Sequence, residues 1–203
     1  MKTKEKFMHY YYKKYPYLQY KYYDDGQWIM FSIPPEILTI IFQNHFNYYP
    51  KTFFDCGAAT GEIVYRAEKL GMVSTGIDIK KYPYQNENLE KLFIDGKIQI
   101  KSILDCNSIR ADMAYCNGTL TYFSENELPQ VLEKFKTCKM LTAIHNTTED
   151  VIAAKKQGDE LLTCNKPRLI KNRGWWMNAF IDNDFSVKYD NLAHCFCAFP
   201  KTR

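Results

Sequence analysis

From residue 52 onward, short apolar runs alternate with amphipathic stretches, and this alternation constrains the fold more than any other feature of the chain. The pattern predicts strands at 52–56, 72–79, 97–105, 111–116 and 139–145, and helices at 61–71, 86–96, 124–135, 148–162 and 175–183. Strands that alternate with helices form a mostly parallel sheet with helices on both faces. Two further strands, predicted at 185–190 and 192–199, are joined by a short turn, so they must be antiparallel to each other.

The first 50 residues differ in composition from the rest of the chain. Residues 1–23 contain eight of the sixteen tyrosines and six lysines. The sequence at 33–46 predicts a helix, because Pro35 suits a first-turn position and a set of apolar residues at helical spacing follows it. We therefore expect a Tyr/Lys-rich segment with one helix at 1–50, and a single domain at 51–203.

Charge and cysteine content exclude several classes of protein. A net charge of +4 over 203 residues is mild, whereas strong nucleic-acid binders usually carry a clear basic stripe. The seven cysteines include no CxxC pair, so we expect reduced thiols in the core and no metal site. Cys195 and Cys197 alternate along a predicted strand, so their side chains share one face and are badly placed to bridge each other.

The chain has no recognisable membrane or export signal. Its N-terminus lacks the apolar region of a signal peptide. No apolar run approaches the roughly 18 residues that a membrane span needs. The expectation is a cytoplasmic protein without membrane contact.

The stretch DCGAATGE, at 55–62, lies between the first predicted strand of the domain and its helix, where nucleotides commonly bind. A Walker-type phosphate loop needs a Lys-Ser/Thr pair after its last glycine, but Glu62 stands there and would repel a triphosphate. A dinucleotide fingerprint counted from Gly57 needs glycines where Ala59 and Glu62 occur. The acid at Glu62 and the missing glycines therefore disfavour both of these alternatives.

Asp55, Gly57, Ala59 and Gly61 place an acid and then small residues at every second position. This spacing resembles the loop of class I (Rossmann-like) S-adenosylmethionine (SAM)-dependent methyltransferases, although Ala59 departs from the commonest pattern. The resemblance implies an α/β fold: a seven-stranded, mostly parallel sheet with an antiparallel C-terminal hairpin, helices on both faces and an N-terminal helical cover. It also implies that these residues and Ala58 bind SAM. Small residues would let the backbone approach the amino-acid tail, and the helix N-terminus would favour its carboxylate.

Acids at the ends of the next two predicted strands extend the resemblance. Asp78 ends the second strand, about 20 residues after the loop, where a carboxylate can accept the ribose hydroxyls. Ile79 follows it. Asp105 ends the third predicted strand, and the family likeness implies that it faces the adenine, next to Cys106.

The fourth predicted strand runs into the segment YCNGTLTYF, where the resemblance places Asn117 and Gly118 against SAM and beside the acceptor. The Asx/Ser-Pro-Pro-aromatic motif of adenine and cytosine amino-methyltransferases is missing here. The Pro-Cys dipeptide of carbon-5 pyrimidine methyltransferases occurs nowhere in the chain. The segment instead resembles that of small-molecule and some protein or RNA methyltransferases, with Leu120 and Phe123 as packing residues.

Methyl transfer mainly requires alignment of donor and acceptor, and a base is needed only for a nucleophile with a high pKa. His145, at the end of the fifth predicted strand, is the candidate base, and its alternative role is that of a cap or core histidine. Tyr122 is a candidate for positioning the acceptor, with packing as the alternative.

The resemblance implies a SAM-dependent methyltransferase that acts on a hydroxyl or amine of a small molecule or sugar and releases S-adenosylhomocysteine (SAH). One alternative is an RNA or protein methyltransferase that uses the basic loop at 165–174 and the N-terminal segment. Another is a non-catalytic SAM-binding protein that acts through protein contacts. The Tyr/Lys-rich stretch itself has three interpretations: a cover over the SAM pocket with Trp28 and Phe31 as walls, a nucleic-acid contact, or compositional bias. The sequence leaves the oligomeric state open.

Overall fold

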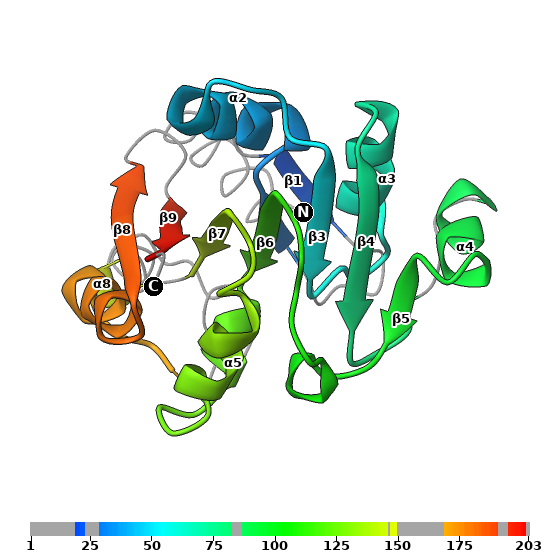
Figure 1. The fold of residues 1–203 in the computed structure, drawn as a ribbon. Helices are drawn as coiled ribbons and strands as arrows, with labels where there is room; N and C mark the ends of the chain where they lie inside the picture. Colours follow the sequence, from blue (N-terminus) through cyan, green and yellow to red (C-terminus); the bar gives the residue numbers. More distant parts are fainter. Residues whose placement is uncertain are drawn as a thin grey trace, which may run out of the picture.

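A computed structural model describes residues 19–22, 29–82, 87–145, 147–149, 169–190 and 195–201, with side chains from residue 32 onward. Figure 1 shows their arrangement. Some predicted features lie outside these residues: Trp28, the side chain of Phe31, most of the Tyr/Lys-rich stretch, most of the helix at 148–162 and the start of the basic loop. Within the described ranges, no helix is long and apolar enough to cross a membrane.

Seven strands form one sheet in the order β5-β4-β3-β6-β7-β9-β8. Their bounds are β3 (Thr52–Cys56), β4 (Val73–Asp78), β5 (Ile98–Ile100), β6 (Met113–Asn117), β7 (Met140–Ile144), β8 (Phe185–Asp190) and β9 (Cys195–Pro200). Strands β3 to β7 pair in parallel, and β9 pairs antiparallel with both β7 and β8. This confirms the predicted sheet. A separate hairpin of β1 (Gln19–Tyr22) and β2 (Ile29–Ser32) precedes it, and the sequence pattern does not predict that hairpin.

Helices cover both faces of the sheet (Figure 1). They are α2 (Pro35–Phe46), α3 (Glu62–Lys69), α4 (Glu87–Ile94), α5 (Leu128–Lys134) and α8 (Arg173–Asp182), with short 3-10 turns η1 (Ile103–Asp105) and η2 (Thr119–Tyr122). Alternate strand residues face opposite ways, so one face packs against α5 and α8 and the other against α2 and α3. We call these the α8 face and the α2 face.

Side chains before the helices explain where they begin. The predicted capping box is formed: the Ser124 hydroxyl accepts the Glu127 N–H (3.3 Å) and the Glu127 carboxylate accepts the Ser124 N–H (2.8 Å). Regular α-helix nevertheless starts only after this turn, at Leu128. Helix α8 begins two residues before the predicted position, because the Asn172 side chain caps it by accepting the Trp175 N–H at 2.7 Å.

The third predicted strand, 97–105, is too long. Strand β5 ends at Ile100, and Asp105 lies five residues later in η1 rather than at a strand end. The reason is a second capping box: the Ser102 side chain accepts from the Leu104 N–H, and the Asp105 carboxylate accepts the Ser102 N–H at 3.2 Å. These local bonds turn the chain away from the sheet.

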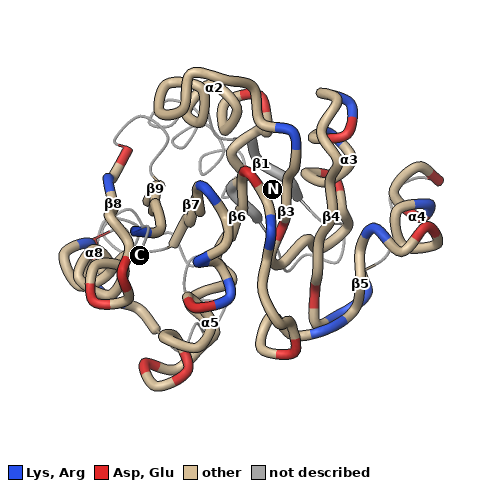
Figure 2. The backbone as a smooth tube through the Cα atoms, in the orientation of Figure 1, with Lys and Arg blue, Asp and Glu red and all other residues tan. Residues whose placement is uncertain are grey.

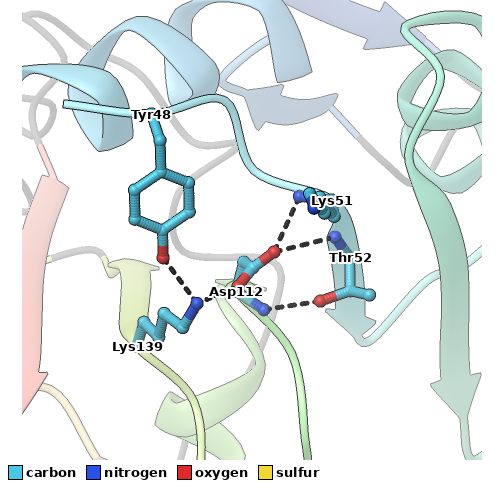
Figure 3. A network of polar contacts seen from close by, with 5 residues as sticks. All are labelled: Tyr48, Lys51, Thr52, Asp112 and Lys139. Atoms are coloured by element: carbon cyan, nitrogen blue, oxygen red, sulfur yellow. Dashed lines mark hydrogen bonds and ion pairs between the residues drawn. The ribbon is translucent and has the colours of Figure 1, made fainter. Parts of the chain in front are cut away.

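A polar network ties α2 to the amino ends of three strands (Figure 3). The Asp112 carboxylate accepts the backbone N–H groups of Lys51 (2.7 Å) and Thr52 (3.2 Å), and it forms an ion pair with Lys139 at 2.7 Å. The Lys139 ammonium also donates to the Tyr48 hydroxyl. Burial alone would raise the pKa of Asp112, but the bonds from Lys139, Lys51 and Thr52 outweigh it and lower that pKa. The network lies at the edge of the sheet opposite to the carboxyl ends.

The described cysteines lie in the core, as predicted. The six described cysteines are free and buried, and the sulfur atoms of Cys195 and Cys197 lie 3.8 Å apart on one face. Figure 2 shows acidic and basic residues interspersed along the described chain.

Candidate functional site

The loop after β3 turns sharply at positions that require small residues. Gly57 and Gly61 have φ of 89° and 88°, and Ala59 has a φ of 48°. The N–H groups of Gly57 and Ala58 both donate to the Ile77 carbonyl at 2.9 Å, which fixes the loop against β4. A side chain at Gly57 would also overlap the Thr119 hydroxyl, so the loop follows β6 closely on its other side.

Asp55 has a buried side chain next to the loop. It lies on the α2 face near the end of β3, and its side chain is 3% exposed. Within the described residues, no hydrogen bond or ion pair reaches this carboxyl group. Burial, and then the charge of Asp78, raises the pKa of Asp55 to about 8. A buried carboxyl group of this kind would gain from a cation.

Asp78 ends β4, as predicted, and its carboxylate closes the loop. It accepts the N–H of Ala59 at 2.9 Å and the N–H of Lys80 at 3.0 Å. Burial raises the pKa of Asp78, and these backbone bonds oppose that shift. The neighbouring Ile79 side chain is 78% exposed, which leaves an apolar surface beside the carboxylate.

The end of β6 lies next to the loop, because Cys56 pairs with Cys116 in the parallel register. Asn117 ends the strand, and the Gly118 N–H donates to the Ile144 carbonyl of β7 at 2.8 Å. Tyr122 follows in η2 and is 42% exposed. Burial and the charge of Asp78 both raise the pKa of Tyr122, so this phenol shares the electrostatic field of Asp78.

His145 lies in an aromatic cluster on the α8 face. Its ring stacks on Trp176 with centroids 3.9 Å apart, and the Phe196 ring lies at 5.1 Å on the same face. The side chain is 5% exposed, and neither ring nitrogen makes a well-formed hydrogen bond within the described residues. Burial lowers the pKa of His145 to about 3, so the ring is neutral at physiological pH.

Two other predicted residues belong to the η1 turn. Asp105 is exposed, and its carboxylate caps η1. Cys106 is buried, and its thiol donates to the Ser102 carbonyl at 3.8 Å. The structure therefore brings together the loop with Asp55, Asp78, Ile79, the end of β6 and Tyr122. No group of three or more His, Cys, Asp or Glu side chains suited to a metal occurs among the described residues.

Solved structures of other proteins share this arrangement of strands and helices. No protein-family model and no curated protein matches the chain. Among solved structures, the Burkholderia thailandensis 1,6-didemethyltoxoflavin-N1-methyltransferase, with its acceptor and SAH bound, is 13% identical with a TM-score of 0.58, over 81% of this chain and 76% of that one. The plantazolicin methyltransferase BpumL, with a pentazolic analog and SAH, is 14% identical with a TM-score of 0.59, over 82% and 83%.

Human N-acetylserotonin methyltransferase in complex with SAM is 17% identical, with a TM-score of 0.54, over 75% of this chain and 48% of that one. The chain has the fold of the SAM-dependent methyltransferases. The topology of this methyltransferase fold accounts for the position of the Gly57 loop, which lies at the carboxyl ends of adjacent parallel strands, where such sheets bind ligands.

Sequence reasoning missed two residues of the site. Thr119 closes the loop by donating its hydroxyl proton to the Cys56 carbonyl at 2.7 Å. Tyr115 lies beside Asp55 on the α2 face, because the two residues pair in register across β3 and β6. The strand alternation predicts which way Tyr115 faces, but the local pattern does not give the register that sets it opposite Asp55.

Proposed function

We propose that this protein is a SAM-dependent methyltransferase. The observation that carries the proposal is the Asp55 side chain, which is buried beside a glycine-spaced loop in the methyltransferase fold and has no hydrogen bond or ion pair with any described residue. The ammonium group of the SAM amino-acid tail is a cation of the kind that this carboxyl group needs.

The other described residues fit the same ligand. We assign the ribose hydroxyls to the Asp78 carboxylate and the adenine to the exposed surface of Ile79, with Asp105 and Cys106 at its outer edge. The Gly57 loop, Gly61 and the end of β6 at Asn117 and Gly118 hold the amino-acid tail. When bound, SAM supplies an activated methyl group, so the chain's own part is to bind, align and exclude water.

The proposed acceptor is a hydroxyl or amine of a small molecule. One structural neighbour was solved with 1,6-didemethyltoxoflavin bound, which supports a small-molecule acceptor, and another with a pentazolic desmethylPZN analog. A histidine with a pKa of about 3 takes up a proton poorly, so His145 suits a hydrogen-bonding role better than that of a general base. Tyr122, exposed and next to Asp78, is the residue that we propose to position the acceptor.

Titration calorimetry with SAM and SAH tests the donor site. We expect binding by the wild type and a loss of at least about tenfold in Asp78→Asn, which keeps the size of the side chain but removes its charge. Asp95→Asn, at the exposed end of α4, is the matched control and should bind normally. Absence of binding by the wild type would refute the proposal.

Transfer from isotopically labelled SAM then separates the acceptor classes. Turnover on small hydroxyl and amine compounds supports the proposed function. Turnover only on RNA or protein would establish one of the alternatives instead, and binding without turnover on any panel would favour a non-catalytic SAM-binding protein. The interspersed charges in Figure 2 give no specific support to RNA.

A further inference from the structure

Tyr115 connects the interior of the sheet to the N-terminal part of the chain. It lies in the middle of β6 and is 1% exposed, on the same face as Asp55. Its hydroxyl oxygen accepts the backbone N–H of Ile33 at 2.9 Å, although the two residues are 82 positions apart in the sequence. Burial raises the pKa of Tyr115 far above its ordinary value, so the phenol stays protonated and remains able to donate as well.

Ile33 stands at the junction between the N-terminal hairpin and helix α2. It follows the last residue of β2 and lies two residues before the start of the helix. Ile33 is fully buried and packs in the same apolar cluster as Tyr115, Leu38 and Phe42. The bond to Tyr115 therefore holds the point where the hairpin enters the domain.

The same phenol lies in the electric field of the Asp55 carboxyl group. Asp55 contributes to the raised pKa of Tyr115, which places the two groups within electrostatic reach. The titratable groups coupled to Asp55 are Asp78 on β4 and Tyr115 and Cys116 on β6. In a buried site, a new charge polarises the neighbouring hydrogen bonds, and bonds in a chain strengthen one another.

We propose that Tyr115 is a positioning residue that couples binding of an ammonium group at Asp55 to the anchoring of the N-terminal hairpin through Ile33. This inference rests on the proposed function, because the ammonium group is that of SAM or SAH. Binding of the cation leaves an ionised carboxylate beside the phenol, and the polarised phenol holds the Ile33 N–H more tightly. By linkage, an anchored Ile33 must strengthen ligand binding by the same factor.

Tyr115→Phe removes only the hydroxyl group and tests this coupling. The probe is SAH, with affinity measured by calorimetry at pH 5.5 and 7.5, and with hydrogen exchange measured at the Ile33 amide. We expect affinity about 5- to 10-fold weaker than the wild type at pH 7.5, where Asp55 can ionise. In the Asp55→Asn background, where no carboxylate can form beside the phenol, Tyr115→Phe should change the SAH affinity by no more than about twofold. In the wild type SAH should slow exchange at Ile33, and in the variant it should not.

Tyr49→Phe is the matched control, because the Tyr49 hydroxyl also bonds a backbone group, the Leu70 carbonyl, at 3.0 Å. It should lose a similar hydrogen bond yet keep the wild-type SAH affinity at both pH values. If Tyr115→Phe does not fold, Asp55→Asn provides the second test: saturating SAH should no longer slow exchange at Ile33.

Two outcomes overturn the inference. One is a Tyr115→Phe protein with wild-type affinity at pH 7.5, and the other is equal protection of Ile33 by SAH in Asp55→Asn and the wild type. Either result would leave the proposed function intact, whereas a wild-type protein that binds no SAH would refute the proposed function first.

Discussion

Asp55 makes a quantitative prediction about the pH dependence of ligand binding. In the unliganded protein its pKa is about 8. Binding of an ammonium group favours the ionised carboxylate, so below pH 8 the protein must release a proton when SAM or SAH binds. The affinity should therefore rise with pH, and the carboxyl group should be neutral before binding.

The magnitude follows from the fraction of Asp55 that is ionised beforehand. At pH 6 the carboxyl group is about 1% ionised before binding, so the cost of ionising it weakens binding about 100-fold. At pH 7.5 the same cost weakens binding only about fourfold. The affinity for SAH should thus rise by up to about 25-fold between pH 6 and 7.5, which corresponds to about 1.9 kcal/mol. At pH 7 about 0.9 proton should be released per SAH bound.

Calorimetry in two buffers with different ionisation enthalpies measures both quantities. Asp55→Asn is the matched control, because the amide has the same size and cannot ionise. The SAH affinity of the variant should not change between pH 6 and 7.5. The wild-type affinity should fall toward that of the variant as the pH approaches 5.5. An equal pH slope in the variant and the wild type, or a wild-type affinity that falls as pH rises, would refute a role for Asp55 ionisation in binding.

Three further changes test other parts of the structure. His145→Phe should preserve the aromatic stack and remove a pH dependence of stability. The folded pKa of His145 lies below its unfolded value, so the free energy of unfolding of the wild type should fall by about 1.4 kcal/mol per pH unit as pH drops below 6.5 toward 3. Urea unfolding at several pH values should show a weaker pH dependence in the variant. Asp112→Asn should lower the free energy of unfolding by about 1–3 kcal/mol at pH 7 without changing SAH affinity. The difference in stability between variant and wild type should shrink as pH falls through the lowered pKa of Asp112, and equal stability at pH 7 would show that the Asp112 network does not stabilise the fold. Gly57→Ala should abolish SAH binding, because the added methyl group would overlap the Thr119 hydroxyl. Adding Thr119→Ala should restore only part of the binding, since the left-handed backbone at position 57 remains strained for alanine, and no recovery in the double variant would contradict the steric explanation.

The sheet and the loop could be predicted because their signals are local. Short apolar runs mark the strands, Asp55 lies one residue before the end of β3, and Asp78 ends β4. Asp105 shows where local signals compete. The alternating pattern extends to that residue, but Ser102 and Asp105 cap a 3-10 turn, and hydrogen bonds of this kind override a strand pattern.

Residues whose environment depends on distant elements could not be predicted. The burial of His145 comes from Trp176, which lies 31 positions later on a helix whose packing the sequence does not reveal. Tyr115 is similar, because its partner Ile33 lies far away in the chain. In both cases the side chain is ordinary in its own segment, and only the tertiary contact gives it a role.

The order of strands in the sheet also determines how the chain can assemble during synthesis. Strand β9 lies between β7 and β8, so β8 emerges from the ribosome before the strand that joins it to the sheet. Until β9 is made, the buried Phe185 side chain and the apolar face of α8 lack the Phe196 and Ala198 surface on which the folded domain packs them. Residues 173–190 therefore cannot complete their packing until β9 has joined β7, and their apolar side chains stay exposed until then.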